Sequence, residues 1–406
     1  MNARSGAVPR AAALLLLALA GQAQPAGAAG TLPVTVGRPS GVVTWAASAG
    51  LAGEGVAGRG YRLVVRTSVG GSGLRIRLSN AFGDRPLTVD KVYAGLRSEG
   101  AALRGGSNRP LTFGGARTVT VPAGAVAWSD PLPGRLPAAA ALAVSLRTPG
   151  ARGPATGHVT ALQTSYVTEG DHTAEDRAAH WTRTTGSWWY LDAVSVRPAH
   201  PATGAVVALG DSLTDGLRST ADRDRRWTDY LARRLRKAGT HVKGVADAGM
   251  SGNEVLQDAG GQSALRRLDR DVLSQPGVRT VVLFEGVNDI KAVGGASAAE
   301  LVAGYRQIVR RAHAAGTCVV GATVGPFKGW PEWSPAAEAV RQEVNRFIRT
   351  GGAFDAVADF DRVLGSPDDP ARMRPALDSG DHLHPGDRGM RALADAVDPG
   401  SLDCGR

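Results

Sequence analysis

The chain has 406 residues, of which 43% are hydrophobic and 21% are charged. These proportions are ordinary for a globular protein, and the length is too great for one ordinary core, so we expect two domains. The formal net charge of +10 suggests nucleic-acid binding at first sight, but the basic residues are spread along the chain without a helix-turn-helix, zinc-finger or RNA-recognition pattern. Nucleic acid is therefore not an expected partner.

Residues 1–28 have the pattern of a secretory signal peptide. Arg4 and Arg10 precede an apolar run over residues 11–20, and the small residues 26–28 provide an A-x-A ending. The run is too short to span a bilayer, and no later apolar run reaches that length. We therefore expect a secreted, extracellular protein without a membrane span.

Residues 30–196 are predicted to form a β-rich accessory domain. Leu74, Ile76 and Leu78 alternate with polar neighbours, as in a half-buried strand. Gly-rich turns separate such segments, and no long helical period is present. The pattern favours a β-sandwich of the jelly-roll type. Strands are expected at residues 61–67, 74–79, 89–96, 118–121, 141–146 and 188–196.

A linker with Pro and Gly, residues 197–204, leads into a second domain over residues 205–406. There, short apolar strands alternate with amphipathic helices, which predicts an α/β fold with a parallel sheet covered on both faces. Strands are expected at residues 205–209, 242–246, 280–284, 318–324 and 356–359, and helices at residues 225–238, 264–273, 298–315, 336–350 and 385–397.

Polar segments follow four of the strands expected in the second domain. They are residues 210–216 (Gly-Asp-Ser-Leu-Thr-Asp-Gly), 248–253 (Ala-Gly-Met-Ser-Gly-Asn), 285–289 (Glu-Gly-Val-Asn-Asp) and, beyond a loop after the last strand, 381–385 (Asp-His-Leu-His-Pro). In an open parallel sheet, functional groups gather beyond the carboxyl ends of the strands. We therefore expect these four segments to meet at one edge of the sheet.

Together these segments supply the groups that acyl transfer needs. Ser212 is the candidate nucleophile, but a serine hydroxyl needs a base and a group that orients the base. Of the eight histidines, only His382 and His384 fall in a loop at this end of the sheet. Asp381 can fix the imidazole tautomer while His384 accepts the Ser212 proton. The alternatives are His382 as the base and Asp381 as a loop carboxylate bound to the backbone.

Three groups are candidates for stabilising the oxyanion of the transition state. They are the backbone N–H of Ser212, the backbone at Gly252, where glycine allows a close approach, and the side-chain amide of Asn288. Each also has a plainer interpretation, since Gly252 is typical of a turn and Asn288-Asp289 of a helix cap. The combination favours catalysis because each element follows its own strand in order.

The four segments resemble the signature of the SGNH (GDSL-type) hydrolase family. Ser212, Gly252, Asn288 and the pair Asp381/His384 match its four signature positions, and the resemblance covers about residues 204–400. It implies a three-layer α/β/α domain, a serine esterase mechanism, and neither a cofactor nor a metal.

Two further features bear on this resemblance. Residues 78–83 (Leu-Ser-Asn-Ala-Phe-Gly) and their surroundings look like the N-terminal domain of secreted actinobacterial members of the family. Asp247 is a departure, because many members carry Asn at this position, and it puts a supporting hydrogen bond in doubt.

The order of the motifs excludes two neighbouring folds. An α/β-hydrolase has Gly-x-Ser-x-Gly with its acid well before its histidine, whereas here Thr214 stands two residues after Ser212, and the acid and histidine share one loop. A dinucleotide-binding fold needs Gly-x-Gly-x-x-Gly after the first strand, and the chain has no such pattern there.

The expected reaction is hydrolysis of carboxylic esters through an acyl-Ser212 intermediate. We expect short-chain or carbohydrate O-acetyl esters as substrates, because an attached β-domain suits a polymeric substrate and few large apolar residues flank the motifs. A lipase- or phospholipase-type activity and an acyltransferase with the same triad stay open. So does a carbohydrate-binding role for residues 30–196.

Some residues have two interpretations that the sequence leaves open. Trp330 and Trp333 border the substrate or pack a loop, and the aromatic residues between positions 181 and 190 pack the two domains together or form a rim of the cleft. Cys318 and Cys404 form a disulfide in an oxidising compartment or stay as two thiols. Neither belongs to a Cys/His cluster, so no zinc site is expected.

Overall fold

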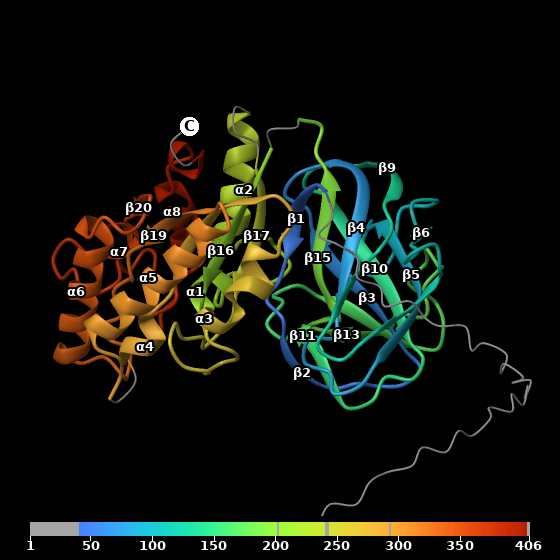
Figure 1. Cartoon of the computed structure of the whole chain (residues 1–406), viewed down its shortest axis with the longest axis horizontal. Helices are drawn as coiled ribbons and strands as arrows, with labels where there is room; N and C mark the ends of the chain where they lie inside the picture. Colours follow the sequence, from blue (N-terminus) through green and yellow to red (C-terminus); the bar gives the residue numbers. More distant parts are fainter. Residues whose placement is uncertain (1–39, 201–202, 240–242, 292–293, 404–406) are drawn as a thin grey trace, which may run out of the picture. The chain divides into compact units, whose positions relative to one another are not determined.

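The computed structural model of the protein describes residues 40–200, 203–239, 243–291 and 294–403 (Figure 1). The leader expected at residues 1–28, the first residues of the β-rich region and Cys404 lie outside these ranges, so both alternatives for Cys318 and Cys404 stay open. Residues Thr35–Arg406 group into one compact unit, and the domain boundaries expected at residues 196 and 204 also stay a prediction. Within the described ranges, no helix combines the length and the apolar character that crossing a membrane requires.

The first described part of the chain, called here the β-sandwich region (residues 40–200), consists of antiparallel β-structure. Its strands are β1 (Val42–Ala46), β2 (Gly50–Glu54), β3 (Arg59–Arg66), β4 (Gly71–Ser79), β5 (Leu87–Leu96), β6 (Arg109–Pro110), β7 (Thr118–Val121), β8 (Val126–Trp128), β9 (Leu132–Leu136), β10 (Ala141–Thr148), β11 (Pro154–His158), β12 (Ser165–Glu169), β13 (Arg183–Thr185), β14 (Trp188–Trp189) and β15 (Leu191–Arg197). They form sheets in the orders β1-β15-β4-β8, β13-β12-β3-β10-β5-β6 and β14-β11-β2, with β9 beside β4 and β7 beside β5. The expected β-sandwich is confirmed.

One expected strand is wrong in its extent. Residues 188–196 were expected to form one strand, but Tyr190 has a φ of 61°, in the left-handed region, and interrupts it. Strand β14 before this residue pairs with β11, whereas β15 after it pairs with β1 and β4. The chain therefore passes from one sheet to another at Tyr190, within a largely apolar run.

Strand β4 is more deeply buried than its alternating pattern predicts. Its apolar positions are buried as expected, but Arg77 is buried as well. Arg77 donates from Nε to Oδ1 of Asp192 at 2.7 Å and from Nη1 to Oγ of Ser274 at 3.0 Å. Because Ser274 belongs to the second half of the chain, the polar face of β4 is a contact face between the two halves.

The second part, called here the α/β region (residues 203–403), contains a parallel sheet. Its strands are β16 (Ala205–Gly210), β17 (Gly244–Gly249), β18 (Val278–Phe284), β19 (Cys318–Ala322) and β20 (Ala356–Ala358). Its helices are α1 (Ser212–Asp215), α2 (Trp227–Ala238), α3 (Ala264–Arg267), the π-helical turn η1 (Leu268–Leu273), α4 (Val287–Lys291), α5 (Ala298–Ala314), α6 (Pro335–Thr350), α7 (Phe360–Leu364), α8 (Asp387–Ala396) and the 3₁₀ turn η2 (Gly400–Asp403). The strand order is β17-β16-β18-β19-β20, with every pair parallel.

The helices of the α/β region form two layers around this sheet. Helix α2 packs with α8 on one face, and α5 packs with α3 and α6 on the other (Figure 1). Helix α2 buries Trp227, Leu231 and Leu235, which are spaced four residues apart and so share one face. The fold is therefore the expected three-layer α/β/α arrangement. One expected helix, residues 264–273, is divided into α3 and η1.

The β-sandwich region covers the outer edge of strand β17. Val245 of β17 donates its N–H to Oγ of Ser68 at 2.9 Å. A Cβ at Gly244 would lie 2.1 Å from the carbonyl oxygen of Val43 in β1, so the glycine is needed for this close approach. An edge strand left open exposes unpaired backbone groups, and here the β-sandwich region closes that edge.

Candidate active site

Ser212 lies at the tight turn between β16 and α1. Asp211 caps the helix by accepting the N–H of Leu213 at 2.9 Å, so that α1 begins at Ser212 itself. A Cβ at Gly210 would lie 2.2 Å from Oγ1 of Thr214. Glycine at the end of the strand therefore lets the chain turn into the helix at once, which presents the Ser212 side chain at the carboxyl edge of the sheet.

The structure brings Ser212, His384 and Asp381 together. Ser212 Oγ lies 2.9 Å from Nε2 of His384, and Nδ1 of His384 lies 2.9 Å from Oδ2 of Asp381. The other oxygen of Asp381 accepts the N–H groups of Leu383 and His384 at 3.1 and 2.8 Å. With Nδ1–H donating to Asp381, Nε2 is free to accept the Ser212 proton.

His382, the alternative base, points elsewhere. Its Nδ1 lies 2.7 Å from Oδ2 of Asp378, and about half of its side chain is exposed. Its φ of 69° is in the left-handed region, and Gly329 makes room for its ring. Of the two histidines, His384 is the one in contact with Ser212.

The surroundings keep His384 neutral and Asp381 ionised near neutral pH. Burial lowers the pKa of His384 below its usual value of about 6.5, and this outweighs the opposing effect of Asp381. Burial alone would raise the pKa of Asp381, but hydrogen bonds from the backbone and side chain of His384 lower it to about 2. A neutral imidazole beside a carboxylate is the state that a general base needs.

Three N–H groups are available to bind an oxyanion. Gly252 follows β17 with a φ of 78°, which favours glycine. Among the described residues, the backbone N–H groups of Ser212 and Gly252 donate to no acceptor. The buried Asn288, in α4, donates one N–H of its amide to the carbonyl oxygen of Asn253 at 2.8 Å and retains a second N–H.

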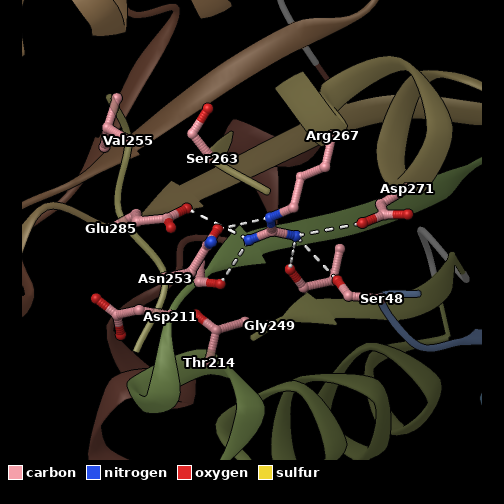
Figure 2. Close-up of polar contacts among 12 residues, drawn as sticks. Ser48, Asp211, Thr214, Gly249, Asn253, Val255, Ser263, Arg267, Asp271 and Glu285 are labelled. Atoms are coloured by element: carbon pink, nitrogen blue, oxygen red, sulfur yellow. Dashed lines mark hydrogen bonds and ion pairs between the residues drawn. The ribbon is translucent and has the colours of Figure 1, made fainter. Parts of the chain in front are cut away.

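Arg267, which the sequence did not single out, ties these segments together (Figure 2). Its guanidinium is fully buried. Nε donates to Oδ1 of Asn253 at 2.6 Å, Nη2 to the carbonyl of Gly210 at 2.9 Å and Nη1 to the carbonyl of Ala248 at 2.7 Å. Nη1 also donates to Oγ of Ser48 in the β-sandwich region at 2.9 Å. One cation thus joins the ends of β16 and β17, the loop after β17 and the other half of the chain.

Asp289 binds the backbone of the loop after β17 rather than capping a helix. Its carboxylate accepts the N–H groups of Val255 and Leu256 at 2.9 and 3.1 Å. Burial outweighs these bonds and raises the pKa of Asp289 to about 6. Glu285, buried 3.5 Å from Arg267, has a pKa that burial raises to about 8. The loop that carries Gly252 is therefore held by hydrogen bonds to the buried carboxylate of Asp289 and from the buried guanidinium of Arg267.

Asp247, the departure from the family pattern, is buried at the end of β17. Its Oδ1 accepts the N–H of Gly249 at 2.8 Å, and its Oδ2 accepts the hydroxyl of Thr228 at 2.7 Å. Burial raises its pKa to about 7. The carboxyl group is thus hydrogen-bonded on both oxygens, to the strand end and to α2.

Trp330 borders the catalytic histidine, whereas Trp333 does not. The ring of Trp330 meets that of His384 edge to face, with centroids 5.8 Å apart. Trp333 instead packs under the ammonium of Lys328, which lies 5.4 Å from its ring centre. Of the two tryptophans, Trp330 has the position to contact a substrate.

One group of described side chains has metal-ligand chemistry, in the β-sandwich region. His172 and His180 each place Nδ1 2.7 Å from a different oxygen of Glu175. Their rings are stacked, with centroids 3.9 Å apart and planes 20° apart. A ring nitrogen binds an ion within its own plane, so one ion does not fit two nearly parallel rings. The geometry suits two histidines that share a carboxylate.

The site and the fold together define the class of the protein. A neutral histidine held between a serine and an ionised aspartate, with unused N–H donors on the segments that follow β16, β17 and β18, is the arrangement that a serine hydrolase uses to cleave carboxylic esters. Residues 208–392 match the GDSL-like Lipase/Acylhydrolase family. The α/β region belongs to this family, which confirms the resemblance found in the sequence.

Several solved structures are similar to part of the chain. Est24, a carbohydrate acetylesterase from Sinorhizobium meliloti, is 18% identical, with 48% of this chain and 96% of that chain covered and a TM-score of 0.39. The aryl esterase of M. smegmatis is 19% identical, with the same coverage and the same TM-score. A lipolytic G-D-S-L family protein from Veillonella parvula is 19% identical, again with 48% and 96% covered and a TM-score of 0.35. A search of curated protein sequences found no match.

Proposed function

We propose that the protein is a secreted serine esterase that hydrolyses short-chain or carbohydrate O-acetyl esters through an acyl-Ser212 intermediate. The observation that carries the proposal is the pair of 2.9 Å contacts that join Ser212, His384 and Asp381. His384 takes the proton of Ser212 during attack, returns it to the leaving alcohol, and then activates the water that releases the acid.

The surroundings of the triad support a small acyl group. A long acyl chain needs an extended apolar channel. The large apolar side chains that are exposed in the described part of the chain are Leu51, Val126, Val159 and Val357. None of them lies on the segments that carry Ser212, Asn288 or His384, where the neighbours include charged Arg218 and Lys291. Leu51 and Val159 line a separate cavity next to Met250 and Ser251.

The Ser212→Ala variant tests the reaction. We expect it to lose p-nitrophenyl acetate hydrolysis by about 10⁴-fold or more in kcat, since the nucleophile is gone. His172→Gln, a change in the β-sandwich region, is the matched control and keeps the wild-type rate. A Ser212→Ala variant with wild-type activity would refute the proposal.

A series of p-nitrophenyl esters tests the acyl group, and competing alcohols test the acceptor. We expect the highest kcat/KM for acetyl esters and free acid as the main product. A maximum at C8 or longer would favour a lipid ester, and acylated sugar as the main product would show an acyltransferase.

A further inference from the structure

His158, at the end of β11 in the β-sandwich region, lies buried against the α/β region. Its Nδ1 is 3.1 Å from the carbonyl oxygen of Ser48, and its Nε2 is 2.9 Å from Oδ1 of Asp215. Neither a carbonyl oxygen nor a carboxylate has a proton to donate. Both contacts are therefore hydrogen bonds at once only when the ring carries both of its protons, as an imidazolium.

The charges around His158 favour this doubly protonated state. Burial alone lowers the pKa of His158, but the charge and hydrogen bond of Asp215 outweigh it, and the pKa is raised. Burial would raise the pKa of Asp215, yet His158 and Ser251 hold it below its usual value. Arg226 opposes the charge on His158, and it donates to the carbonyl oxygens of Asp215 and Ala161. His158, Asp215 and Arg226 line one cavity. The other charged side chains that line this cavity are Arg66, Asp224, Asp229, Arg233, Arg236 and Asp247.

Asp215 connects this histidine to the loop that carries Gly252. Its second oxygen, Oδ2, accepts both the N–H of Ser251, at 3.0 Å, and the hydroxyl of Ser251, at 2.7 Å. Ser251 immediately precedes Gly252, whose N–H is a candidate oxyanion donor. Asp215 is also the last residue of α1, the helix that begins at Ser212.

We propose that His158, which belongs to the β-sandwich region, is a positioning residue for the esterase reaction. It holds Asp215 in place and, through Asp215, the N–H of Gly252. This inference rests on the proposed function. It makes the β-sandwich region part of the catalytic apparatus: a group outside the α/β fold decides how well the oxyanion loop is ordered. The imidazolium needs both of its acceptors, Ser48 and Asp215, to keep its orientation.

The kinetics of two variants test the proposal. Misplacing a transition-state donor costs kcat while substrate binding is kept. We therefore expect His158→Ala to lower kcat for p-nitrophenyl acetate about 10- to 100-fold with an unchanged KM. His158→Gln, which can still donate to Asp215 from its amide, restores part of that loss. His172→Gln, in the same region, is the control and keeps the wild-type kcat.

The dependence of kcat on pH distinguishes a positioning role of His158 from a role in folding alone. In the wild type, kcat falls as alkaline pH removes a proton from His158, above the usual histidine pKa, because one of its two hydrogen bonds is lost. In His158→Gln that alkaline step is absent, since the amide does not titrate there. Unfolding curves of each variant show whether it is folded. If His158→Ala does not fold, the comparison of the pH profiles of His158→Gln and the wild type tests the role of His158.

Wild-type kcat in both His158 variants, or an unchanged alkaline step in His158→Gln, would overturn the inference. If Ser212→Ala is inactive at the same time, the esterase proposal stands and only the role of His158 fails. If Ser212→Ala keeps its activity, the esterase proposal itself fails.

Discussion

Arg267 donates from Nε to Oδ1 of Asn253 at 2.6 Å, and this bond joins a buried cation to the loop that carries Gly252. The cation lies 3.7 Å from the carboxylate of Asp271 and 3.5 Å from Glu285. Removing one partner of a buried charged contact typically costs about 3–5 kcal/mol, and here the buried oxygens of Asn253, Gly210 and Ala248 would lose their donor.

The Arg267→Met variant should therefore lose about 3–5 kcal/mol in its free energy of unfolding, measured by chemical denaturation. Arg266→Met is the matched control, since the exposed Arg266 pairs only with Asp258 at the surface and such pairs contribute about 1 kcal/mol or less. Equal losses in the two variants would contradict the role assigned to Arg267.

The acid limb of the pH profile should report His384. The base must be neutral to accept the Ser212 proton, and burial lowers its pKa. Activity should therefore rise with pH through a midpoint below about 6.5, the usual histidine value. The measurement is kcat/KM for p-nitrophenyl acetate against pH, and a midpoint above 6.5 would contradict the burial of the base.

Trp330 should help to set that midpoint. Its ring packs edge to face with that of His384, with centroids 5.8 Å apart, so the Trp330→Ala variant should let water reach the imidazole and raise its pKa toward the usual value. We expect the acid limb to move to higher pH and KM to rise. Trp333→Ala is the control, because that ring packs against Lys328. A shift of the same size in both variants would rule out a specific effect of Trp330.

Asp381 orients the base without reacting, so the Asp381→Asn variant should lose less activity than Ser212→Ala does. Asp381 also raises the pKa of His384 by its charge and hydrogen bond. Its removal should therefore move the acid limb of the remaining activity further down in pH. An upward shift would show that the carboxylate does not act on His384 in this way.

Asn288 should act on the transition state more than on substrate binding. The Asn288→Ala variant removes a candidate oxyanion donor, and the loss of one such donor typically lowers kcat about 100- to 1000-fold. We expect KM to change little, as measured with p-nitrophenyl acetate. A kcat within about twofold of the wild type would remove Asn288 from the oxyanion site.

The grouping of Ser212, His384 and Asp381 could be expected from the sequence because the elements that carry them are local. Ser212 and the pair Asp381/His384 sit in short motifs whose chemistry is visible in the order of the residues, and each motif follows a strand with a clear apolar run. The parallel sheet brings the ends of those strands to one edge. The helix and strand positions in the α/β region were predicted for the same reason.

The groups that support the site were not predicted because they act over long distances in the sequence. Arg267 lies in what looks like an ordinary charged helix, and nothing in its neighbours points to Ser48 or Gly210. His158 was counted with the β-rich half, since its partner Asp215 is 57 residues away. The break at Tyr190 was missed because nothing in this largely apolar run of residues indicates a left-handed backbone.

The covered edge of β17 limits how this protein can be divided. A fragment that begins at β16 would lose Ser68, which accepts the Val245 N–H, and Val43, whose backbone packs closely against Gly244. Its parallel sheet would then present a bare strand to any other chain. Removing the β-sandwich region should therefore promote self-association through the exposed edge of β17.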